Sequence, residues 1–134
     1  MQVAELSGDF VFTVSVPPTA AATAIEVPIV RPPWAATITS IVWIPGAAIT
    51  ANASNFFTLT PRNRGAGAGA VIPATARSYA ATNSVSTTPE ALVLSTTATD
   101  LLVAAADVLT AHFTHSGTGL AIPAGLVQVT MRLR

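Results

Sequence analysis

Two histidines near the C-terminal end are the residues best suited to acid–base or metal chemistry. His112 and His115 follow Asp107, and hydroxyl side chains surround them. The run reads as a β-strand, on which residues three apart point to opposite faces. We therefore expect neither a shared metal ion nor a Ser-His-Asp triad, because both need side chains that converge. His115 is expected to be a polar surface group, and Asp107 to bond to turn amides.

A second candidate is the glycine-rich stretch 61–70, in which glycine alternates with alanine after Arg62 and Arg64. A phosphate-binding loop needs a Lys-Ser or Lys-Thr pair between a strand and a helix, and none follows here. We expect a flexible surface loop that starts at Pro61. Its two arginines can pair with carboxylates of a binding partner.

The remaining polar and aromatic residues show no catalytic spacing. The six carboxylates are scattered, without the pairing of an acid and a base or the order of a calcium loop: Glu5, Asp9, Glu26, Glu90, Asp100 and Asp107. Trp34 and Trp43 could together stack on a sugar, but Trp43 alternates with Ile41 as a core residue does. Trp34 follows two prolines and is expected at an interface or in a packing contact. We predict no enzyme, no cofactor and no metal site.

Composition limits the possible partners. The chain has 134 residues, a net charge of zero, no cysteine, and only 9% charged residues, against about 25% in typical domains. Without a basic field we expect neither nucleic acid nor a membrane as partner, and no transmembrane segment or signal peptide. Twelve charges on a monomer surface of ~6,500 Å² protect poorly against self-association. This surface favours an oligomer or a larger assembly.

The elements that carry these residues read as strands with a period of two. The last run is the clearest, with Val127, Val129, Met131 and Leu133 on one face. We expect it to pair with Val108–His115 through a broad hairpin. Further strands are expected at residues 10–16, 25–30, 37–44, 56–60 and 92–96. The stretches 71–76 and 77–81 are undecided, with Tyr79 expected to anchor a strand. Residues 101–105 fit either a strand or a helical turn.

Proline and glycine residues separate these strands, and the apolar residues do not recur with the 3.6-residue period of a helix. Pro28 inside its run indicates an edge or bulged strand, and the run 37–44 suits a central one. About eight short antiparallel strands predict an all-β sandwich or jelly roll with little or no helix. We expect an N-terminal arm over 1–9 and one β-sandwich domain over 10–134.

The segment from Gly117 to Gly125, which contains TGLAIPAG, resembles a hairpin of trimeric dUTPases, which are also β jelly rolls. The likeness covers about ten residues. The phosphate loop and the glycine-rich C-terminal arm of that family have no counterpart here. The resemblance therefore implies a shared way of turning a β-hairpin, and a dUTPase-type activity remains the weaker alternative.

In size, composition and strand rhythm the whole chain resembles capsid decoration proteins of tailed bacteriophages. That resemblance implies a homotrimer on the outside of a virion, made in the host cytoplasm, that stabilises the shell by bridging major capsid subunits. The residues expected at the capsid or subunit interface are Phe10, Trp34, Arg62 and Arg64. A receptor-binding or glycan-binding fibre domain is the alternative.

Overall fold

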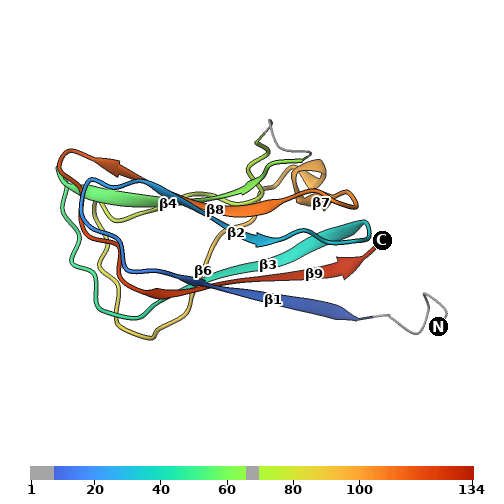
Figure 1. Ribbon diagram of the computed structural model, residues 1–134, viewed down its shortest axis with the longest axis horizontal. Coiled ribbons are helices and arrows are strands. Elements are labelled where there is room, and N and C mark those ends of the chain that lie inside the picture. Colours follow the sequence, from blue (N-terminus) through green and yellow to red (C-terminus); the bar gives the residue numbers. More distant parts are fainter. Residues whose placement is uncertain (1–7, 66–69) are drawn as a thin grey trace.

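The computed structural model describes residues 8–65 and 70–134, which form two antiparallel sheets packed face to face (Figure 1). The first sheet contains, in spatial order, β1 (Asp9–Val16), β9 (Gly125–Leu133), β3 (Ala36–Pro45) and β6 (Glu90–Ala91), with β7 (Leu102–Val103) also on β3. The second sheet contains β2 (Ile25–Val30), β8 (Leu109–Ser116), β4 (Phe56–Asn63) and β5 (Arg77–Ser78). A four-residue 3-10 helix, η2 (Ala98–Leu101), precedes β7.

The strand order is that of a jelly roll. The first half of the chain pairs with the second half in reverse: β1 with β9, β2 with β8, β3 with β6 and β7, and β4 with β5. The connections β1–β2, β2–β3, β3–β4 and β8–β9 each cross from one sheet to the other. This wrapping is that of a jelly roll, with one sheet of five strands and one of four. The predicted all-β fold class is confirmed.

The predicted hairpin between the last two long strands is wrong. β8 belongs to the second sheet, while β9 lies between β1 and β3 in the first, so residues 117–124 cross between the sheets. The predicted face of β9 is confirmed, because Val127, Val129 and Met131 are each 1% exposed and Leu133 is half-buried. Alternation fixed which side chains are buried, but it did not determine the pairing partner.

The core lies between the two inward faces. Trp43 of β3 is fully buried, with its ring centroid 5.6 Å from that of Phe113 on β8. Phe57 of β4 completes the group, 6.0 Å from Phe113. Aromatic rings at these separations add to the free energy gained by burying their surface. The contact joins the two sheets at their centre.

The strand that carries Arg62 is longer than predicted. β4 continues past Thr60 to Asn63, paired with β8 throughout, so Arg62 lies within a strand and not in a loop. Pro61 is tolerated because β5 pairs only with Thr58 and Leu59, which leaves the opposite side of Pro61 without a partner strand. Residues 66–69 of the predicted loop lie outside the described residues.

Three further expectations can be compared with the structure. β2 is an edge strand with a register shift after Pro28, as predicted. The undecided stretch 101–105 combines both alternatives, because the end of η2 is followed directly by β7. Of the predicted arm, Asp9 already belongs to β1, and residues 1–7 are outside the described part. Within that part no helix is long and apolar enough to span a membrane.

Candidate interaction surfaces

The two histidines lie on opposite faces of β8, as the period of two predicts. His112 is on the outer face of the second sheet, level with Glu26 of β2 and Thr60 of β4. His115 is on the inner face, where its Nε2 lies 2.9 Å from the carbonyl oxygen of Leu120. The prediction of a surface group is wrong for His115, because its half-buried ring packs under the turn after β8 and beside Phe57. Its contacts are those of a packing residue.

Asp107 holds a turn at the other end of β8. Its Oδ2 accepts hydrogen bonds from the Ala104 amide at 2.9 Å and from Asn63 Nδ2 at 3.0 Å. The predicted bond to a turn amide is therefore confirmed, and Asp107 and His115 are separated by the length of the strand. In residues 8–65 and 70–134, no three His, Cys, Asp or Glu side chains gather closely enough to hold a metal ion.

Arg64 binds within its own chain. Its Nε and Nη2 donate to the two oxygens of Glu26 at 2.7 and 2.5 Å, and Thr110 Oγ1 donates to the same carboxylate at 2.5 Å. The hydrogen bond from Arg64 lowers the pKa of Glu26 from 4.5 to about 2. A bidentate pair of this kind is geometrically specific. Arg64 is thus already occupied, contrary to its predicted role of meeting a partner's carboxylate.

Arg62 lies on the outer face of the second sheet, in the row beside His112. Its Nε and the Nδ1 of His112 are buried and make no hydrogen bond among the described residues. Burial, and next the charge of Arg62, lower the pKa of His112, so His112 is neutral near pH 7. Of the two predicted arginines, Arg62 is the one that forms no ion pair with a described residue.

Phe10 and Trp34 contact each other. Their ring centroids are 5.3 Å apart, and both residues are half-buried. Phe10 is the second residue of β1 and Trp34 precedes β3, so this pair lies at the same end of the sandwich as the final residues of β4, which include Arg62 (Figure 1). The fold thus brings the four predicted interface residues to one end. The idea of a sugar platform fails, because Trp43 is fully buried.

Sequence reasoning missed a polar network that joins the two sheets. Glu90 of β6 accepts hydrogen bonds from Arg77 Nε at 2.7 Å, from the Tyr79 hydroxyl at 3.0 Å, and from Ser84. The Tyr79 hydroxyl in turn accepts from Trp43 Nε1 at 2.9 Å, and the Arg77 guanidinium lies over the Tyr79 ring. Burial raises the pKa of Tyr79 to about 12. The signal available in the sequence was the single tyrosine, Tyr79, with Glu90 as the next acid after it. Their spacing alone could not show that the two side chains are hydrogen-bonded.

The connections at the opposite end of the sandwich carry no charged side chain. Four of them meet there, all within the described part of the chain: 17–24, 46–55, 79–89 and 117–124 (Figure 1). None of the four contains Asp, Glu, Lys, Arg or His. The other end carries Arg31, Arg62, Arg64, Asp107 and Arg134. We call the surface formed by residues 17–24, 46–55, 79–89 and 117–124 the uncharged end. These four stretches are far apart in the sequence, so only the topology shows that they form one surface.

The loops of the uncharged end are bonded to one another. Thr19 and Ile122 exchange two backbone hydrogen bonds of 2.9 Å, and the Gly46 amide donates to the Ala124 carbonyl at 2.7 Å. Asn55 Oδ1 accepts from both the amide and the hydroxyl of Thr118. Side-chain bonds of this kind replace the backbone partners that loops lack. These hydrogen bonds fix the connections relative to one another.

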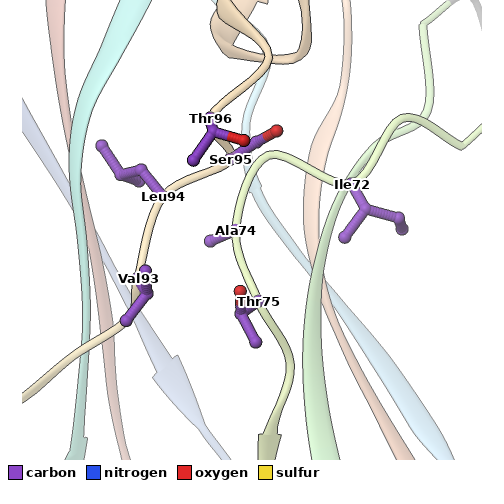
Figure 2. A pocket seen from close by; sticks show the side chains of 7 residues that line it. All are labelled: Ile72, Ala74, Thr75, Val93, Leu94, Ser95 and Thr96. Atoms are coloured by element: carbon purple, nitrogen blue, oxygen red, sulfur yellow. The ribbon is translucent and has the colours of Figure 1, made fainter.

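The described residues line at least two shallow cavities that are mainly apolar. One of about 320 Å³ lies in the uncharged end, lined by Ala48, Ile49, Thr50, Leu120, Ala121 and Pro123. Another of about 300 Å³ lies between residues 72–75 and 93–96 (Figure 2). Neither is lined by a titratable side chain of the described residues. The linings offer packing surface without groups for acid–base catalysis.

Comparison with models of protein families, with curated proteins and with solved structures finds no match to this chain. The jelly-roll fold serves many unrelated functions, so the fold by itself assigns none. Any proposal for function therefore depends on the surfaces described above.

Proposed function

We propose that the protein is a structural virion component that binds the outside of a phage capsid as a homotrimer and stabilises the shell by bridging major capsid subunits. The single observation that carries the proposal is the uncharged end, formed by four interlocked connections. Charged side chains are depleted from the centre of protein interfaces because burying them without a partner costs free energy. An end without them suits burial in an assembly.

The arrangement of charge supports this reading. Three ion pairs occupy six of the twelve formal charges, namely Arg64–Glu26, Arg77–Glu90 and Arg132–Asp9. Large apolar side chains remain exposed on the accessible surface of 6693 Å²: Val11, Val71, Ile72, Val85, Val93, Leu102 and Leu126. Few free charges and many exposed apolar groups are typical of a chain that is covered in its working state.

We place the uncharged end against the shell and the arginine-bearing end toward solvent or a neighbouring copy. Each copy would need to cover a standard interface of about 1,200–2,000 Å². Three copies bound together multiply weak single contacts into tight attachment. This orientation differs from the one expected from sequence, which placed Arg62, Arg64 and Trp34 at the contact.

The test uses particles of the major capsid protein from the same phage. Wild-type protein should sediment as a trimer and co-sediment with these particles. Ala121→Lys places a charge on the uncharged end and should weaken binding about tenfold or more, because the lysine would be desolvated without a partner. Ala105 is also exposed and lies at the opposite end, so Ala105→Lys is the matched control and should bind normally.

A stable monomer without affinity for the particles would overturn the proposed function. If Ala105→Lys lost binding while Ala121→Lys kept it, the function would stand but the orientation would be reversed. Circular dichroism of both variants checks that each is folded.

A further inference from the structure

The edges of the two sheets are protected to very different degrees. An edge strand presents unpaired N–H and C=O groups that can pair with another chain, and proteins block this with short strands, charges, proline or bulges. β5, β6 and β7 have two residues each. β2 carries Pro28, the exposed Glu26 and a register shift. Each of these edges has at least one recognised form of protection.

β1 has none of them along most of its length. It is eight residues long without proline or a basic residue, and its one charge, Asp9, is at its first position and bonded to Arg132. β9 pairs with it from Asp9 to Val16 on one side only. On its other side no backbone hydrogen bond joins it to a described residue. Alternate residues of β1 therefore direct their N–H and C=O groups outward.

The side chains of β1 are also incompletely covered. Phe12 and Val14 point into the core but stay half-buried, whereas their β9 partners Val129 and Val127 are 1% exposed. On the outer face Val11 is 56% exposed. One more strand beside β1 would extend the core and cover these groups. The edge thus lacks both a hydrogen-bonding partner and an apolar cover among the described residues.

We propose that β1 pairs antiparallel with β1 of a second copy about a twofold axis, so that two first sheets become one continuous sheet. Pairing centred on Thr13 sets Phe12 opposite the partner subunit's Val14, and Val11 opposite the partner subunit's Ser15. Inward side chains then meet inward side chains, which strand pairing requires. Residues 10–16 carry no charge, so no like charges oppose each other.

A twofold contact of this kind closes on itself after one pairing. Single chains would form dimers, and if three copies already form a unit, the contact joins two such units. Pairing of this kind does not require capsid binding. Because one strand pair buries less than a standard interface of ~1,600 Å², the association should be weak, so measurements should extend from about 1 µM to about 1 mM.

The test compares two threonine-to-lysine variants by sedimentation velocity across that range. Thr13 is exposed on β1, and Thr13→Lys sets two lysines opposite each other at the twofold axis. Thr39 is an exposed threonine of the inner strand β3 in the same sheet. We expect the mass at high concentration to fall by half with Thr13→Lys and to stay at the wild-type value with Thr39→Lys.

Loss of association in both variants would place the contact on the face of the sheet and overturn the proposal. A wild-type mass that does not rise with concentration, or that Thr13→Lys leaves unchanged, would overturn it too. Amide hydrogen exchange of the wild-type protein gives a second readout that needs no variant. Half of the β1 amides should exchange more slowly as concentration rises, and concentration-independent exchange would contradict the pairing.

Discussion

Arg77 of the second sheet and Glu90 of the first form an ion pair with an Nε–Oε2 distance of 2.7 Å. β5 and β6 are the edge strands on the same side of the sandwich, so this pair closes that side. The other side, between β1 and β2, has no hydrogen bond or ion pair between described residues of the two strands. The two sheets are therefore joined by an ion pair at one side, whereas β1 and β2 at the other side are in contact without such a bond.

Removing Glu90 from its ion pair with Arg77 should destabilise the fold. The Arg77 and Glu90 side chains are 18% and 19% exposed, so Glu90→Ala leaves a largely buried guanidinium without its partner. We expect a loss of about 3 kcal/mol in the free energy of unfolding, measured by urea denaturation. Asp9→Ala breaks the Arg132 pair, which is mostly exposed, and should change stability little. Equal effects of the two variants would contradict the structural role of Glu90.

The single tyrosine reports directly on the same network. Since burial raises the pKa of Tyr79 to about 12, its ionisation should be delayed relative to an ordinary tyrosine near 10. Absorbance at 295 nm during an alkaline titration measures this, because no other tyrosine contributes. The native protein should titrate near pH 12 and the urea-unfolded protein near pH 10. A native midpoint near 10 would show that the hydroxyl is accessible.

Lowering the pH should reduce the free energy of unfolding, partly because Glu26 becomes protonated. Its folded pKa of about 2 lies below the ordinary value of 4.5, so the stabilisation is complete above pH 4.5 and is lost as pH falls toward 2. Urea unfolding at pH 7 and pH 3 should show a smaller loss of stability for Glu26→Gln than for wild type. Identical losses would mean that the Arg64 contact does not persist in solution.

His115 and Gly119 should be energetically coupled. Gly119 has φ +65°, a backbone conformation that alanine adopts only with strain. A Cβ at this position would also overlap the His115 ring, so Gly119→Ala is destabilising for both reasons. His115→Ala alone should cost about 1–3 kcal/mol through lost packing and the lost bond to Leu120. In that background Gly119→Ala should cost less, as a double-mutant cycle measures.

Gly117 is the control for this cycle. It also has positive φ, but an added Cβ would overlap Ser54 and Asn55 instead of the histidine. Gly117→Ala should therefore destabilise by the same amount with and without His115. Coupling of equal size at both glycines would argue against a direct contact between His115 and Gly119.

The predicted face of the last strand can be tested at adjacent positions. Val129 lies between Phe12 and Ile41 of the neighbouring strands and is 1% exposed, so Val129→Asp buries an unpaired charge and should prevent folding. Thr130 points to the outer face, and Thr130→Asp should leave the melting temperature nearly unchanged. Similar behaviour of both variants in a thermal melt would contradict the assigned face.

Local patterns were sufficient for the long strands and their faces. They were not sufficient for the short ones, because the predicted strand at 92–96 contains only an isolated bridge at Leu94, and β6 lies just before it. A period of two shows which side chains of β9 and β1 are buried, because neighbouring residues of a strand must point to opposite sides. Pro28 indicated an edge strand for a similarly local reason, since it cannot donate a backbone hydrogen bond. Composition likewise indicated a surface with few charges, because only 9% of the residues are charged.

The all-β class, the buried face of β9 and the scarcity of charge follow from residue types and their alternation. The folded chain was needed to show that β8 and β9 lie in different sheets, that Arg64 is bound by Glu26, and that four uncharged connections share one end. These features depend on where each connection crosses between sheets. The alternation of buried and exposed residues along a strand repeats every two residues. It shows which face of the strand is buried, but not which distant strand pairs with it.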